Sequence, residues 1–81
     1  MNPSEFINKK IKYLKSKFKD ITIKYQYKLT TDTHIIKISP LSLYENNIEY
    51  LFDEEDIENE FNKLYPSEEI LFISEDSLTE I

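Results

Sequence analysis

The sequence contains no glycine, no cysteine and no arginine, and its ten basic residues are all lysine. It therefore has no glycine-rich loop for phosphates or nucleotides, no GxSxG nucleophile motif, no GXXG clamp of a KH domain and no standard EF-hand loop. Without cysteine there is neither a disulfide nor a thiolate metal site, and a catalytic cysteine is excluded. We expect a fold held by its hydrophobic core, or by the core and a partner, in a reducing cytoplasm.

The sequence also lacks a long hydrophobic run. No apolar stretch approaches the roughly 18 to 20 residues that a membrane-spanning helix needs, and the N-terminal segment lacks the apolar core of a signal peptide. We therefore expect neither export nor membrane insertion. The 81 residues are 40% hydrophobic and 14% aromatic, which is enough apolar surface for one folded domain over residues 1–81.

The N-terminal half predicts one helix followed by a hairpin. Asn2 precedes a proline, and apolar residues then recur at steps of three and four, so we expect a helix over about 3–18 with one buried face. The apolar period then changes to two. This change predicts strands over about 21–29 and 34–39 joined by a turn, with Pro40 ending the second strand.

The C-terminal half predicts a long helix and a third strand. Ser42 and Glu45 are spaced as a capping box, which predicts a helix over about 43–64. Residues 70–74 include an uninterrupted apolar run, the pattern of a strand that is buried on both faces. We expect this strand to be central in the sheet or covered by a partner. The tail, residues 75–81, receives no assignment.

The order α-β-β-α-β predicts the α+β class, as a small two-layer α/β sandwich. We expect a three-stranded, mostly antiparallel sheet with both helices on one face. The other face of the sheet would carry exposed lysines beside an apolar strip that includes Ile35. A dimer contact would cover such a strip, and so would the tail, in which Leu78 and Ile81 are apolar.

Charge is distributed unevenly along the chain. Residues 1–40 contain nine lysines and three acids, a net charge of +6, whereas residues 41–81 contain one lysine and thirteen acids, a net charge of −12; the whole chain has −6. The acids are densest over Asp53–Glu60, where six of eight residues are carboxylates. One interpretation is an acidic face that attracts a basic partner. The alternatives are pairing between the two helices and an ordinary solvated helix surface.

The second helix has two apolar stripes when each residue is advanced by about 100° around its axis. One stripe, expected to face the sheet, is Leu43, Tyr50, Ile57, Phe61 and Leu64. The other is Tyr44, Ile48 and Phe52, and one small sheet does not bury both. Either the helix breaks near Asp53, or the second stripe reaches the surface, or it packs against the first helix. We expect partner-binding residues at Tyr44, Glu45, Ile48, Glu49, Phe52, Asp53, Glu55 and Asp56.

No residue pattern predicts an enzyme. His34 is the sole histidine, and spacing alone marks no serine or carboxylate as its partner. The acidic run lacks the loop geometry of a calcium site, so we expect no metal. We also expect no cofactor and no catalytic residue, because no motif for either is present. The lysines of the first helix, with Tyr25 and Tyr27, suggest nucleic-acid binding. Against this, the tyrosines share a face with core residues and the net charge repels a polyanion.

The functional hypothesis is a non-enzymatic, acidic protein-binding module. It would be an inhibitor for a basic partner, similar in size and charge to immunity proteins and antitoxins. In this hypothesis the apolar residues of the second stripe anchor the partner and the neighbouring acids steer it. The alternatives are a self-associating accessory protein that dimerises through the open sheet face, and then a small nucleic-acid-binding regulator.

Overall fold

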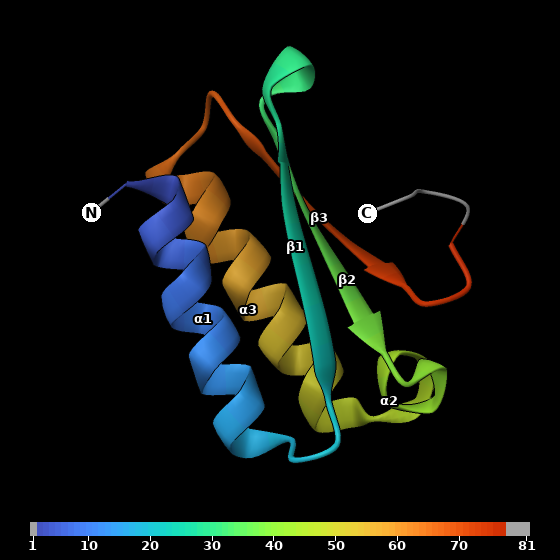
Figure 1. Cartoon of the computed structure of the whole chain (residues 1–81). Helices are drawn as coiled ribbons and strands as arrows, with labels where there is room; N and C mark the ends of the chain where they lie inside the picture. The colour runs from blue at the N-terminus through green and yellow to red at the C-terminus, as the bar shows by residue number, and fades with distance from the viewer. Residues whose placement is uncertain (1, 78–81) are drawn as a thin grey trace.

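The computed structural model describes residues 2–77. The elements are, in chain order, α1 (Pro3–Lys17), β1 (Thr22–Lys28), η1 (Leu29–Thr31), β2 (Thr33–Ser39), α2 (Leu41–Asn46), α3 (Ile48–Leu64) and β3 (Glu69–Ser74). The long helices α1 and α3 lie side by side against one face of the sheet (Figure 1). The predicted α-β-β-α-β order is therefore confirmed, with the expected second helix divided into α2 and α3. No helix within residues 2–77 is long and apolar enough to cross a membrane.

Asparagine side chains cap both long helices. The Oδ1 atom of Asn2 accepts the amide of Glu5 at 2.8 Å, as the sequence predicts for α1. Asn47 is the N-cap of α3, where its side chain accepts the amide of Tyr50 at 3.0 Å. The expected capping box at Ser42 is wrong, because α2 begins at Leu41 and has no side-chain cap. Free amides at a helix start need an acceptor, and Asn47 supplies it where the long helix begins.

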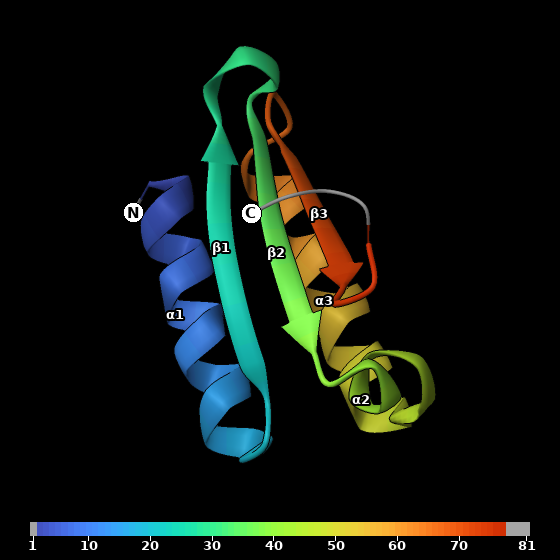
Figure 2. The ribbon, with the colours of Figure 1, turned by 45° about the vertical axis from the view of Figure 1, so that its right-hand side comes forward.

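The sheet has the strand order β1-β2-β3, with β2 in the middle (Figure 2). Strands β1 and β2 are antiparallel, whereas β2 and β3 are parallel, so the sheet is mixed rather than mostly antiparallel. The parallel pairing follows from the connection, because α3 runs back along the sheet and returns the chain to the end at which β2 began. The third strand lies at an edge. The expectation of a central strand over 70–74 is therefore wrong.

The hairpin between β1 and β2 turns without glycine. Its tight point is Asp32, which has the positive φ of 48° in the left-handed region. Aspartate is among the few non-glycine residues that adopt this conformation readily. The hydroxyl of Tyr27 donates to Oδ1 of Asp32 at 2.5 Å, which links the turn to the end of β1.

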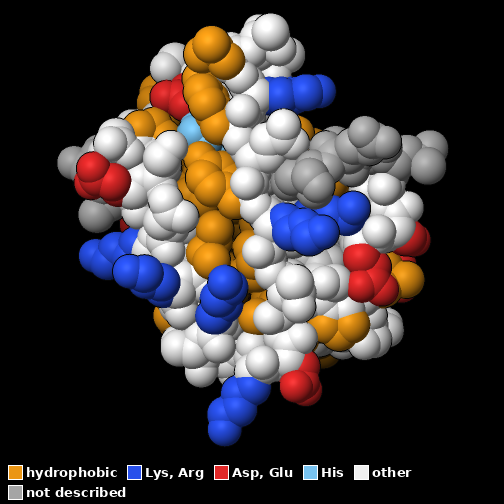
Figure 3. Space-filling view, in the orientation of Figure 1, with side chains coloured by type: hydrophobic (Ala, Val, Ile, Leu, Met, Phe, Trp, Pro, Cys, Tyr) orange, Lys and Arg blue, Asp and Glu red, His pale blue; other side chains and the backbone are white. Residues whose placement is uncertain are grey.

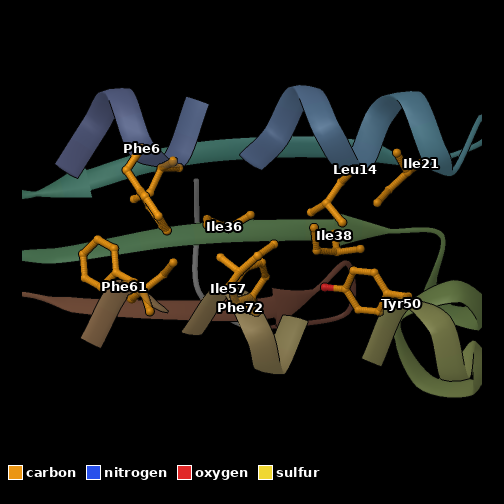
Figure 4. Packing of buried hydrophobic residues seen from close by; sticks show 11 residues of the cluster. Phe6, Leu14, Ile21, Ile36, Ile38, Tyr50, Ile57, Phe61 and Phe72 are labelled. Carbon is orange, nitrogen blue, oxygen red and sulfur yellow. The ribbon is translucent and has the colours of Figure 1, made fainter. Parts of the chain in front are cut away.

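The core lies between the helices and the middle strand. Figure 4 shows Leu14 of α1 and Tyr50 of α3 converging on Ile38 of β2, with Phe61 further along α3. Within the stripe expected to face the sheet, Tyr50, Ile57 and Phe61 are at most 3% exposed. The stripe does not extend to the end of α3, because Leu64 is 53% exposed. Packing the buried side chains between the helices and the sheet removes them from water, which stabilises the fold.

The open face of the sheet exposes less apolar surface than the sequence predicts. Ile35 and Ile73, which alternate with the core-facing residues of their strands, are only 2% and 8% exposed. Leu71 remains 46% exposed beside them. The tail residues Leu78 and Ile81 lie outside the described residues, so the structure does not test the interpretation that they anchor the tail.

Candidate functional site

The helix break lies earlier than predicted. The chain leaves α2 and enters α3 at Asn47, so the expected break near Asp53 is wrong, and α3 continues through that residue. Two apolar side chains of the second stripe nevertheless reach the surface, since Ile48 is 66% and Phe52 is 63% exposed. Leu51, between them in sequence, is 39% exposed.

These three side chains form what we call the outer patch: Ile48, Leu51 and Phe52. Their spacings of three and four residues place them on neighbouring turns of α3. Exposed carboxylates on α2 and α3 lie next to them in sequence, namely Glu45, Glu49, Glu55 and Asp56. Five of the eight residues expected to bind a partner are therefore exposed on α3 together with Leu51, and Glu45 is exposed on α2.

Tyr44 and Asp53, the other two predicted residues, have partners inside the fold. The hydroxyl of Tyr44 donates to the backbone carbonyl oxygen of Phe72 in β3 at 3.1 Å. The carboxylate of Asp53 accepts from Lys17 Nζ at 2.9 Å and from the hydroxyl of Tyr13 at 3.2 Å. Both side chains therefore connect elements of the fold, and the sequence could not separate them from their exposed neighbours.

Among residues 2–77, the lysine-rich and acidic helices pair at two places along the line where α1 meets α3. Besides the contact with Asp53, Lys17 Nζ lies 3.9 Å from Glu49, and Lys10 Nζ lies 3.1 Å from Glu60. The hydrogen bond to Asp53 raises the pKa of the Lys17 ammonium above its ordinary value. Other lysines of α1 and those of β1 spread over the surface in Figure 3. Part of the charge asymmetry is thus satisfied within the fold, and several other acids, such as Glu45, Glu55 and Asp56, are exposed to solvent.

A second group of carboxylates lies on the flank of α3 next to the buried stripe. Burial raises the pKa of Glu54 to about 7, the charge of Glu58 adds to this effect, and the hydroxyl of Tyr50, 3.5 Å away, opposes it. Burial also raises the pKa of Glu58. Neither carboxylate has a cationic partner within residues 2–77. The sequence signal for this group is the four-residue spacing from Tyr50 to Glu54 to Glu58, which places all three on one flank.

The structure also gives His34 partners that the sequence did not reveal. Its Nε2 atom lies 2.6 Å from Oε1 of Glu68, and its Nδ1 atom lies 2.5 Å from the hydroxyl of Tyr25. The Tyr25 hydroxyl in turn lies 3.2 Å from Oγ of Ser4. His34 is 2% exposed, and its ring stacks at 4.6 Å on that of Tyr27. In Figure 3 the histidine shows only as a small pale-blue area among hydrophobic side chains.

This chain of hydrogen bonds satisfies both ring nitrogens of a buried histidine, as buried polar groups require. The hollow beside it measures about 250 Å³ and is lined by Asn2, Pro3, Ser4, Tyr27, His34 and Glu68. Ligand pockets are commonly about 300 to 1,000 Å³ and enclose most of their ligand. The hydrogen bonds therefore connect the start of α1 to the sheet and to the loop between α3 and β3. The hollow beside them offers little room for a substrate.

A wider hollow of about 490 Å³ lies where the end of α1 meets α2. Its lining includes Phe18, Lys19, Asp20, Leu43 and Asn46. None of these residues was predicted to bind, and the hollow contains no base paired with a nucleophile. Within residues 2–77, no three His, Cys, Asp or Glu side chains are placed to hold a metal ion.

Comparison with protein-family models, with curated proteins and with solved structures finds no match for this chain.

Proposed function

We propose that this chain is a non-enzymatic binding protein that docks a basic protein partner on the outer patch of α3, as an inhibitor or immunity-like protein would. The observation that supports the proposal is the exposure of Ile48 and Phe52, both above 60%, on a helix that also exposes Glu49, Glu55 and Asp56. Large apolar side chains within a charged rim are the usual anatomy of a protein interface. On this proposal Ile48, Leu51 and Phe52 are the anchors.

The acids beside the patch would steer the partner. The net charge of −6 acts at long range, and Glu45, Glu55 and Asp56 have no ion-pair partner within the described part of the chain. Unpaired charges of one sign accelerate association with a partner of the opposite sign and make binding sensitive to salt. Glu49, whose side chain is 75% exposed, belongs with these acids despite its 3.9 Å distance to Lys17.

Two further parts of the proposal rest on composition and on the His34 network. A cytoplasmic location fits a chain without cysteine. Absence of catalysis fits a histidine that is 2% exposed beside a hollow of about 250 Å³.

The test is a pull-down from the native host's lysate with matched variants. Ile48→Ser with Phe52→Ser removes the two anchors, and Leu29→Ser with Leu64→Ser removes two other exposed side chains, 77% and 53% exposed, as the control. We expect a basic protein to be retained by the wild type and by the control, and lost from the anchor variant. Equal retention by all three proteins would contradict the proposal. Recovery of the chain itself alone would instead support the self-associating alternative.

A second pair of variants, matched in net charge, tests whether the acids beside the outer patch steer the partner. Glu55→Lys with Asp56→Lys, and as control Asp20→Lys with Glu75→Lys, each change the net charge from −6 to −2, because each reversal adds two positive charges. We expect association with the captured partner to slow more for the first pair than for the control, because both lose the same net charge but only the first reverses charges beside the outer patch. The slowing should disappear at about 0.5 M salt, where charges are screened beyond roughly 4 to 5 Å.

A further inference from the structure

The third strand leaves one edge of its backbone without a partner. The amide of Glu69 donates to the carbonyl of Asp32 at 2.9 Å, so Glu69 points toward β2. Since backbone direction alternates along a strand, Ile70 and Phe72 point their amides and carbonyls away from the sheet. No residue within 2–77 accepts a hydrogen bond from either of these amides.

This edge also lacks the features that usually prevent strand addition. Lysines and prolines commonly protect an exposed edge, and β1, at the opposite edge, contains Lys24 and Lys28. Strand β3 reads EILFIS and contains neither lysine nor proline. Its one strongly exposed apolar side chain, Leu71 at 46%, lies on the open face. The apolar run that was expected to be a central or partner-covered strand is therefore at an open edge. A fourth strand would give β3 a neighbour on both sides, as its apolar composition favours.

Negative charge gathers at the same edge. The Tyr44 hydroxyl donates to the outward-pointing carbonyl oxygen of Phe72 at 3.1 Å, so it lies directly at the outer edge of β3. Its pKa is raised first by burial and then by the charges of Glu54, Glu58, Asp76 and Glu45, so these four carboxylates are near enough to act on the hydroxyl. Glu54 and Glu58 are half-buried without a cationic partner within the described residues. A cation brought to this edge would therefore meet carboxylates that have lost part of their hydration.

We propose that the outer edge of β3 accepts an extended, lysine- or arginine-bearing segment of a protein partner as a fourth strand. Strand addition supplies backbone hydrogen bonds for Ile70 and Phe72, and it displaces the Tyr44 hydroxyl from the Phe72 carbonyl. Side chains of an added strand alternate between the two faces of the sheet. Basic side chains on the helix face then meet Glu54 and Glu58, and apolar ones on the open face meet Leu71. The inference rests on the proposed function for the basic character of the partner, but uses a different surface.

The probe is a short capped peptide of alternating valine and lysine, titrated into the full-length, ¹⁵N-labelled protein. A peptide of the same sequence with every residue N-methylated retains the charge but has no backbone donor, whichever way it runs along β3. We expect the first peptide to slow hydrogen exchange at the Ile70 and Phe72 amides by about tenfold or more, and the methylated peptide to leave exchange unchanged. Equal effects of both peptides, or no change at these two amides, would overturn the inference.

A variant pair tests the same edge from the protein's side. Leu71→Lys places a protective lysine beside the edge, and Leu29→Lys places the same charge at another exposed leucine, in η1. We expect only Leu71→Lys to weaken peptide binding, by about tenfold or more. Equal affinity of the two variants would refute strand addition at β3. The Ile48→Ser, Phe52→Ser protein should still bind the peptide, so failure at β3 and failure of the outer patch are distinguishable.

Discussion

Replacing Glu54 by glutamine tests the electrostatics of the α3 flank directly. Glu54 lies one turn after Tyr50, half-buried, and burial raises the pKa of its carboxyl from 4.5 to about 7. The folded protein therefore prefers the protonated form, whereas the unfolded chain ionises at the ordinary value. Stability from the neutral carboxyl is fully present below about pH 4.5 and is lost as the pH rises through about 7.

The size of the effect follows from the shift of about 2.5 pH units, the difference between 4.5 and about 7. At about 1.36 kcal/mol per unit, the upper limit is about 3.4 kcal/mol. Because Glu54 is partly exposed, solvent screening reduces this to about 1 to 2 kcal/mol. Glutamine remains neutral at every pH and retains the oxygen that Tyr50 contacts. Glu54→Gln should therefore match the wild type near pH 4 and be more stable by about 1 to 2 kcal/mol near pH 8.

The assay is urea denaturation of both proteins at several pH values between about 4 and 8. For a chain of this length, the difference at high pH corresponds to a rise in Tm of roughly 4 to 16 °C. Glu55→Gln, which changes an exposed neighbour on the same helix, is the control and should show no comparable pH-dependent gain. A Glu54→Gln protein that is less stable than the wild type near pH 8, or equally stable at every pH, would refute the inferred burial penalty.

Two further predictions concern contacts between elements, and both are read by urea denaturation. Glu68→Ala leaves Nε2 of buried His34 without its acceptor and should lower the free energy of unfolding by about 1 to 3 kcal/mol. Glu68→Gln should lower it by less, and Glu69→Ala, at an exposed position, should leave it nearly unchanged. Equal losses for Glu68→Ala and Glu69→Ala would contradict this role of Glu68. Lys17→Met removes the ion pair with Asp53 and should destabilise the protein by an amount that shrinks at about 0.5 M salt; a loss that does not change with salt would show that packing of the lysine stem matters more than charge.

The elements that follow from local sequence were predicted well. The cap at Asn2, the apolar steps of three and four in α1, and the two-residue period of β1 each involve residues close together in the chain. The exposure of Ile48 and Phe52 was also one of the predicted outcomes, because a helix with two apolar stripes does not bury both against one sheet.

Other features depend on which distant residues meet. The role of Asn47 as the N-cap of α3 was missed. An asparagine caps a helix only where the backbone before it is not helical, and the sequence did not show that α2 ends at this point. Tyr44 was placed with the exposed stripe, but its hydroxyl reaches a carbonyl of β3, 28 residues later in sequence. The partners of His34 come from β1, which supplies Tyr25 and Tyr27, and from the loop before β3, which supplies Glu68, and the sequence does not show that these segments meet.

Periodicity, capping and composition are local properties of the chain, and they are enough to predict the types and order of the main elements and the sign of the charge in each half. The tertiary structure alone decided that β3 lies at an edge, that Asp53 turns to Lys17, and that Glu68 meets His34. These outcomes depend on the path of the α3 connection and on side-chain packing between elements. A strand's own residues, which read the same in the middle of a sheet and at its edge, do not specify them.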